Sequence, residues 1–264
     1  MRKVILIWVL FLTAVNLFGQ GELDDQEKIL YRNERTWAFL LNTNGWGGSF
    51  RYGKRVDYFN KNLYEIDLTT LKDPKEFKYS SDLDSRSWVY GKLNSCFLLR
   101  FGYGRQQEIF QKFDKSGISI RFNYTGGVTF AVYKPVYYTV WFWHFYPDST
   151  YSIDEQEQKF YDIGNGWDIM GKAAFSKGLN EVRILPGIYA KTGLTFEFST
   201  NDAIVNAVEF GTQFDLFPKP VPIMANDLNR WGYLSFFICY RFGRVIDPSA
   251  PKTYKSDFSD DMYP

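Results

Sequence analysis

Strict alternation of apolar and polar side chains is the feature that most constrains what this chain can fold into. In residues 118–124, ISIRFNY, isoleucine or an aromatic residue takes every even position and a polar residue takes every odd one. Such alternation predicts a β-strand with two unlike faces. In a soluble protein the apolar face would pack on a core. In a membrane barrel the apolar face meets lipid and the polar face lines the lumen.

The same pattern recurs along the chain, which indicates an all-β fold. Candidate strands lie at 35–42, 47–54, 62–69, 92–103, 116–133, 135–146, 181–199, 203–218 and 230–243. The alternation in VRILPGIYAKTGLTFEF persists for 17 residues, whereas the modal strand has about 5–6 residues and a tilted membrane strand needs about 9–11. The polar stretch 152–164, SIDEQEQKFYDIG, is predicted to form a short helix in a long loop.

Aromatic content is the outlying number in the composition. The 264 residues include 25 Phe, 19 Tyr and 8 Trp, which make 20% of the chain, while charged residues still make 23%. This combination suits a barrel with an aromatic outer band and a polar lumen. The 31 basic and 30 acidic side chains give a formal net charge of +1, which argues against a dedicated nucleic-acid partner.

The first residues are typical of a secretory signal peptide. Arg2 and Lys3 precede an apolar run from Val4 to about Leu17, which is short for a spanning helix of about 20 residues. Cleavage is expected near Gln20, with an uncleaved anchor as the alternative. No second apolar run is long enough for a membrane helix, so a membrane-spanning chain has to be a barrel.

These observations predict four segments. A signal peptide covers 1–20, a lead-in covers 21–34, the barrel covers 35–245, and a flexible tail covers 246–264, which is rich in Pro, Asp, Ser and Lys. The prediction is a single antiparallel transmembrane β-barrel with long loops in a bacterial outer membrane. A soluble sandwich, the alternative, explains the alternation but explains less well the outward aromatic residues and the export signal.

The polar faces of the candidate strands carry a nearly balanced set of charges. The predicted lumenal network comprises Arg51, Arg100, Arg121, Arg183, Lys191, Arg241, Glu65, Asp67, Glu197, Glu209 and Asp215. A charge held away from bulk water needs a partner, so ion pairs are expected, with Glu209, Asp215 or Glu197 facing Arg121. The lipid-facing set is predicted to be Phe97, Phe101, Ile120, Phe122, Phe210, Phe214, Ile238 and Tyr240.

Several stretches resemble outer-membrane barrel proteins of Bacteroidota that are mostly uncharacterised. GIYAKTGLTFEFS, FGTQFDLFPKPVPIM and YLSFFICYRFGR are similar to the C-terminal half of that family, and YGKLNSCFLLRFGYGRQQEIFQK to its central portion. The resemblance covers roughly residues 30–245. It implies the fold and the compartment, and it supplies no catalytic residues.

Strand number and orientation follow from counting. A closed barrel of this class needs an even number of strands and nine candidates are present, so eight are predicted, with ten as the alternative. The strand expected not to span is the first, 35–42. The links NTNG (42–45) and STND (199–202) are predicted to be periplasmic turns, which would place 55–61, 104–115, 147–180 and 219–229 outside.

Little in the sequence points to catalysis. The single histidine, His144, lies near Asp148, Ser149 and Thr150, but no nucleophile motif accompanies it, so we interpret it as a histidine at the membrane interface. One His and two distant Cys make a zinc site improbable, and no cofactor is expected. Cys96 and Cys239 could pair on an exported chain, yet two unpaired wall residues is the preferred interpretation.

The sequence therefore predicts a non-enzymatic barrel with a structural or interaction role, a subunit or anchor of an outer-membrane assembly or export machine. Its expected partners are outer-membrane lipid and other outer-membrane or periplasmic proteins. The alternatives are a small-solute pore and, more weakly, an enzyme acting at the rim through His144. Eight strands enclose little more than their own side chains, which favours the first role.

Overall fold

The computed structural model describes residues 33–81, 84–113, 117–147, 151–163, 169–201, 203–225 and 229–246. The predicted signal peptide, nearly all of the lead-in and all of the tail after Ile246 lie outside these ranges. Within them, no helix has both the length and the apolar character needed to cross a membrane.

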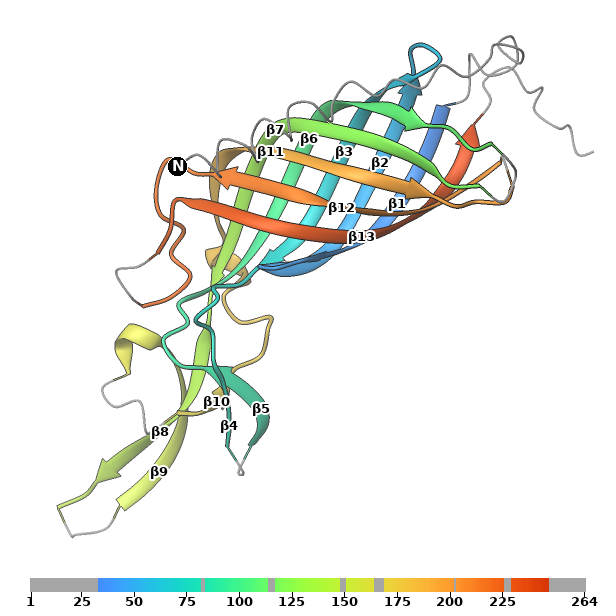
Figure 1. The fold of residues 1–264 in the computed structure, drawn as a ribbon. Helices are drawn as coiled ribbons and strands as arrows, with labels where there is room; N and C mark the ends of the chain where they lie inside the picture. Colours follow the sequence, from blue (N-terminus) through green and yellow to red (C-terminus); the bar gives the residue numbers. More distant parts are fainter. Residues whose placement is uncertain are drawn as a thin grey trace, which may run out of the picture.

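Eight antiparallel strands close into one barrel (Figure 1). They are β1 (Asn33–Asn42), β2 (Gly45–Arg55), β3 (Asn60–Leu71), β6 (Asn94–Phe110), β7 (Ser119–Pro135), β11 (Arg183–Glu197), β12 (Ile204–Leu216) and β13 (Gly232–Ile246). Closure comes from β1 and β13, which pair from Asn33↔Ile246 to Asn42↔Phe237. The prediction of eight strands is confirmed.

The candidate strand that does not span is a different one from that predicted. Residues 35–42, expected to fail, form β1 and close the barrel. Instead the candidate at 135–146 leaves it as β8 (Tyr137–Phe145). The reason is pairing: the ladder between β6 and β7 ends at Asn94↔Pro135, and β8 then pairs with strands outside the barrel.

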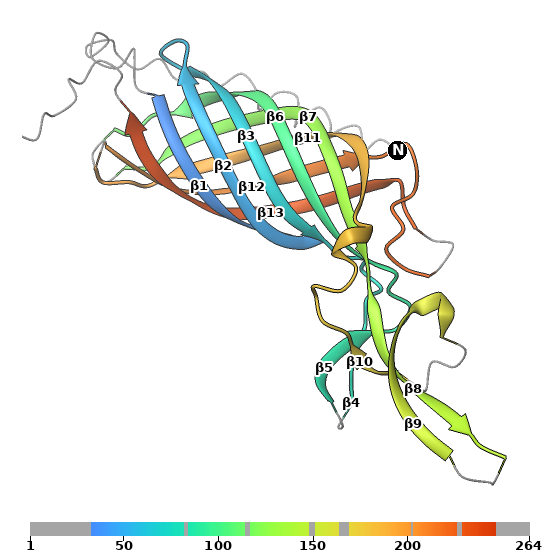
Figure 2. The ribbon, with the colours of Figure 1, turned by 180° about the vertical axis from the view of Figure 1, so that it is seen from behind.

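The segments outside the barrel form an extension at one of its ends (Figure 2). It consists of a hairpin of β4 (Lys78–Ser81) and β5 (Asp84–Val89), a sheet in the order β10 (Ile169–Lys172), β8, β9 (Tyr151–Lys159), and the short 3₁₀ turns η2 (Phe160–Asp162) and η4 (Leu179–Glu181). The short helix predicted within 152–164 is limited to the 3₁₀ turn η2, because residues 152–159 belong to β9. Cross-strand pairing with β8, such as Ile153 with Trp143, overrides a polar local sequence.

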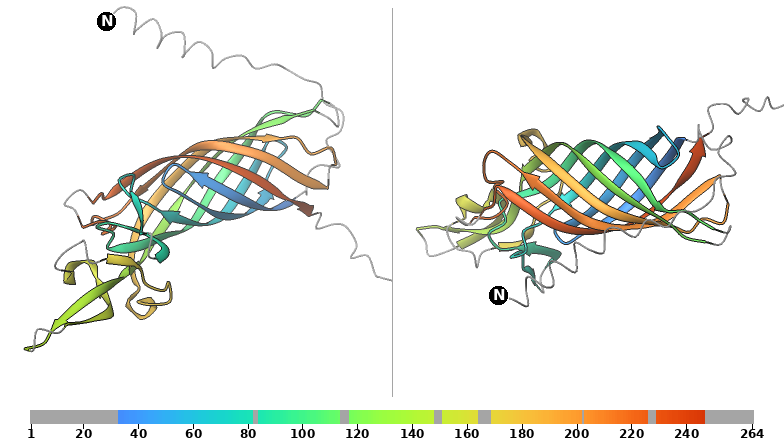
Figure 3. Two further views of the ribbon diagram at one scale, coloured as in Figure 1. Left: turned by 90° about the horizontal axis from the view of Figure 1, so that it is seen from below. Right: turned by 45° about the horizontal axis from the view of Figure 1, so that its top comes forward.

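The three long connections gather at one end of the barrel, together with the tight turn between β1 and β2, and the other three turns lie at the opposite end. The loop end carries 72–93, 136–182 and 217–231, whereas the terminal end carries the start of β1, the end of β13 and the turns 56–59, 111–118 and 198–203. Figure 3 shows the extension at the end opposite to that where β13 finishes.

The predicted sidedness was partly wrong. NTNG lies at the loop end and STND at the terminal end, so 55–61 and 104–115 face the opposite side from 147–180 and 219–229. Successive connections in an antiparallel barrel alternate between its ends. Counting 135–146 as a spanning strand added one crossing between the two pairs of segments and so misplaced the two earlier ones.

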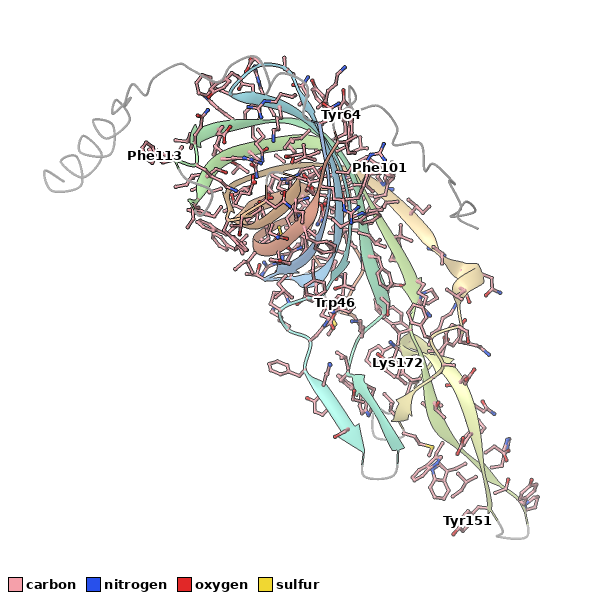
Figure 4. The ribbon with its side chains drawn as sticks, turned by 90° about the vertical axis from the view of Figure 1, so that its right-hand side faces the viewer. Trp46, Tyr64, Phe101, Phe113, Tyr151 and Lys172 are labelled. Carbon is pink, nitrogen blue, oxygen red and sulfur yellow. The ribbon has the colours of Figure 1, made fainter. Side chains whose placement is uncertain are left out.

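The barrel wall has an apolar outside and a polar inside. All eight predicted lipid-facing residues point away from the lumen, and Phe101, Phe210 and Ile238 are 41%, 46% and 51% exposed. Figure 4 shows Tyr64 and Phe101 on the outer side of the wall. Buried positions on the same strands are largely charged or hydroxylated. This inversion of a soluble fold is the arrangement of a membrane-spanning barrel.

Candidate functional site: a filled lumen and an aromatic extension

The middle of the lumen holds six charged side chains, which we call the central charge cluster. Its members are Arg51, Glu65, Asp67, Lys191, Glu209 and Arg241, and none is more than 4% exposed. They come from β2, β3, β11, β12 and β13, so the cluster ties together strands from opposite parts of the wall. Three cations face three anions, which leaves the cluster neutral.

Glu65 is the hub of this cluster. Its Oε1 accepts hydrogen bonds from Arg51 Nη2 at 3.1 Å, Lys191 Nζ at 2.8 Å and Arg241 Nη2 at 3.3 Å, and from the Ser49 hydroxyl at 3.0 Å. Arg51 in turn bridges Glu65 to Glu209, with Arg51 Nη1 2.9 Å from Glu209 Oε2. These hydrogen bonds and ion pairs offset the free-energy cost of burying ionised groups away from water.

Towards the loop end the lumen holds the ion pair of Arg100 with Asp215 and then an apolar cap. Arg100 Nε and Nη2 donate to the two carboxylate oxygens of Asp215 at 2.7 and 3.0 Å, and Arg100 Nη1 donates to Thr69 Oγ1 at 2.8 Å. The cap is a buried cluster of Leu71, Cys96, Leu98, Ala131, Phe217, Val221, Ile223, Met224 and Tyr233. The loop after β12 supplies four of these residues, so that loop folds into the mouth of the barrel.

A third group of charges fills the terminal end. Arg121 contacts Glu197 and lies 3.5 Å from Glu34 and 3.9 Å from Glu108. Lys61 Nζ lies 2.6 Å from Glu34. Of the three partners predicted for Arg121, the structure selects Glu197, since Glu209 is held by Arg51 and Asp215 by Arg100.

Sequence reasoning missed three residues of this group: Glu34, Lys61 and Glu108. Glu34 fell in the predicted lead-in and Lys61 just before a predicted strand, yet both are buried, at 4% and 6% exposure. Extending the alternation beyond the apolar part of each strand would have found them. Glu34 continues the inward series through Thr36 and Ala38.

Ten of the eleven predicted network residues lie inside the barrel, and Arg183 does not. Arg183 is the first residue of β11, at the rim of the loop end, and its side chain is exposed. It lines a cleft of about 340 Å³ at the base of the extension, beside Lys159 and Glu181. Because β11 begins at the rim, its first side chain lies beyond the end of the lumen and cannot point into it. Cys96 and Cys239 are both free and buried.

The extension is fixed to the rim by buried polar contacts. The Tyr138 hydroxyl lies within hydrogen-bond distance of the backbone oxygens of Val89, at 2.8 Å, and Lys92, at 2.7 Å, which share its one proton. Burial raises the pKa of this tyrosine. Nearby, hydrogen bonds from Lys159 and Tyr137 lower the pKa of the exposed Glu181. The extension therefore starts from an ordered base.

Large apolar side chains are exposed at the far part of the extension, which we call the aromatic tip. Its members are Phe142, Trp143, Tyr146, Tyr151 and Ile153, each between 41% and 61% exposed. The rings of Trp143 and Tyr151 lie 5.5 Å apart across β8 and β9, and Figure 4 shows Tyr151 at the end of the extension. Exposed apolar groups concentrated in this way mark interaction surfaces.

His144 lies on β8 in the extension, not on the barrel wall at the membrane interface, so that interpretation was wrong. The side chain is 47% exposed, and its Nε2 lies 3.5 Å from Asp154 Oδ2. Asp148, Ser149 and Thr150 lie outside the described residues. The described part of the chain holds no group of three or more potential metal ligands.

Comparison with known proteins gives fold-level likeness at low scores. No protein-family model matches the sequence, and no curated protein matches it. The chain is similar to Neisserial surface protein A, with 7% identity, a TM-score of 0.40, and coverage of 82% of this chain and 97% of that one. It is also similar to Ail, the attachment invasion locus protein of Yersinia pestis, in complex with the heparin analogue sucrose octasulfate. There the identity is 8%, the TM-score 0.38, and the coverage 82% and 99%.

Proposed function

We propose that the protein is a non-enzymatic outer-membrane barrel that anchors a larger assembly and presents its extension to a partner protein. The filled lumen is the observation that carries this proposal. Ion pairs occupy the lumen at three levels, and a cluster of apolar side chains closes the loop end. With the lumen occupied in this way, the surface left for function is the part of the chain outside the barrel.

The outer membrane as compartment is supported by the chain's own architecture. The strand number is even, β1 begins where β13 ends, and short turns share that end while long connections lie at the other. This is how outer-membrane barrels are built, with the long loops outside the cell. Export by a signal peptide cleaved near Gln20, and membership of the Bacteroidota family that the sequence resembles, are parts of the same proposal. The extension then faces outward.

Affinity purification from native membranes in mild detergent tests the partner role. The informative variant replaces both Trp143 and Tyr151 of the aromatic tip by serine. Phe113→Ser is the matched control, because Phe113 is fully exposed but lies in a turn at the terminal end.

We expect a protein that co-purifies with the unmodified chain and with the Phe113 control to be lost from the tip variant. Heat-modifiable gel migration confirms that all three proteins are folded barrels. If the same proteins co-purify in equal amount with all three, the tip is not the docking surface and the proposal fails.

A further inference from the structure

The outer wall carries two grooves on the same strands, one above the other. The rim groove, of about 570 Å³, lies at the loop end and is lined by Asp73, Lys75, Phe214, Asn229, Arg230, Trp231 and Gly232. The wall groove, of about 450 Å³, is lined by Phe122, Thr192, Gly193, Leu194, Phe210, Gly211, Thr212, Phe236 and Phe237.

Strand register places the two grooves in line. On β12 and β13, Thr212 pairs with Phe236, Phe214 with Leu234 and Leu216 with Gly232. The wall groove therefore lies about four residues below the rim, or about 13 Å at 3.3–3.4 Å per residue. Phe214, which also lines the rim groove, and Leu234 lie between the two levels on the outer face, where they are 42% and 60% exposed.

The rim groove has an excess of positive charge. Lys75 and Arg230 are exposed, and no carboxylate of the described residues lies within ion-pair distance of either. Asp73 is only 8% exposed, and its Oδ1 accepts the backbone N–H of Lys75 at 2.9 Å. The Asn229 side chain is bonded to the backbone of Ile223 and Met224.

The wall groove exists because two small residues face each other among large ones. Thr192 pairs with Thr212 across β11 and β12, and the rings of Phe122, Phe210 and Phe236 surround this pair on the outer face. A trough with a threonine floor and apolar walls suits a hydrocarbon chain. Trp231, 60% exposed at the rim, is the residue type that sits at the headgroup level.

We propose that this face retains one lipid with a phosphate-bearing anionic headgroup. The phosphate lies against Lys75 and Arg230, and one acyl chain runs past Phe214 into the trough over Thr192 and Thr212. Continuity of the cationic groove with the lipid-facing wall favours a lipid over a free anion. The site rests on the membrane-barrel fold and not on the partner role, so either proposal can fail alone.

Native mass spectrometry of the folded barrel, purified in mild detergent, counts the lipids that stay bound. The probes are phosphatidylglycerol, diacylglycerol with the same acyl chains, and glycerol phosphate without acyl chains. One variant, Lys75→Gln with Arg230→Gln, removes the head contacts, and a second, Thr212→Trp, fills the trough. The matched control is Arg35→Gln with Lys54→Gln, two exposed cations on the outer wall at the terminal end.

We expect the unmodified barrel to retain one phosphatidylglycerol in preference to diacylglycerol. The head variant should lose about 30-fold in affinity for phosphatidylglycerol, given about a fivefold effect per cation at a membrane surface. Thr212→Trp should also weaken the binding of phosphatidylglycerol, and the control variant should bind it as the unmodified barrel does. Equal loss in the control, or no loss in either test variant, overturns the site. Binding of glycerol phosphate as tightly as the lipid shows an anion site instead.

Discussion

Neutralising Glu65 is the sharpest perturbation of the filled lumen. Glu65→Gln keeps the shape of the side chain but leaves Arg51, Lys191 and Arg241 facing only Asp67 and Glu209. The central charge cluster then changes from neutral to one excess positive charge. All of these groups are at most 4% exposed, so water cannot compensate.

The expected cost is large. Removing one partner of a buried ion pair costs about 3–5 kcal/mol. With a urea dependence of about 1–3 kcal/mol per molar, the unfolding midpoint of the barrel in lipid vesicles should fall by at least about 1 M. Adding Arg241→Met to Glu65→Gln restores two cations against two anions. The double variant should therefore be more stable than the sum of the two single losses predicts.

Urea titration read by tryptophan fluorescence and heat-modifiable gel migration gives the four free energies of the cycle. Glu157→Gln is the control, since its ion pair with Lys177 spans 2.9 Å but is 37–51% exposed and should contribute at most about 1 kcal/mol. Losses for Glu65 and Arg241 that add within about 0.5 kcal/mol would refute the reasoning.

Three further outcomes follow from the structure. Phe210→Arg should destabilise the vesicle-inserted barrel by about 2–4 kcal/mol if that face meets lipid, and a change below about 0.5 kcal/mol, measured by urea titration, would place it in water. In double-mutant cycles on the unfolding free energy, Arg121→Met should couple to Glu197→Gln and not to Glu209→Gln; equal coupling to both contradicts the separate groups. Tyr138→Phe removes the hydroxyl that is shared between the backbone oxygens of Val89 and Lys92, so limited proteolysis should cut the extension faster while the heat-modifiable migration of the barrel stays unchanged; unchanged proteolysis would contradict the anchoring contact.

The barrel could be predicted from the sequence because the alternation of apolar and polar residues directly indicates one face towards lipid and one towards the lumen. The outward phenylalanines and the inward charges of β6, β7, β12 and β13 follow from parity alone, once lipid is chosen as the outer solvent. The near-equal numbers of cations and anions then predicted that the lumenal side chains would form ion pairs. Which carboxylate meets Arg121 depends on the pairing of β7 with β11, which are far apart in the sequence, and on the register that sets Arg121 opposite Thr195. No local pattern contains that information.

The extension could not be predicted for the opposite reason. β8 is as rich in aromatic residues as a barrel strand, and the polar sequence of β9 is typical of a helix. Their fold is set by pairing with each other and by the contacts of Tyr138 at the rim. Arg183 was misassigned because alternation predicts which face of a strand a side chain lies on, but not the position of that residue along the barrel axis. A residue on the inward series points into the lumen only within the height of the barrel.

Conductance across a planar lipid bilayer tests the central claim most directly. The folded barrel should give no stable single-channel steps at moderate voltage, because the charge groups and the apolar cap occupy the lumen. Stable, ohmic openings of the unmodified protein would contradict this account and would favour a small-solute pore.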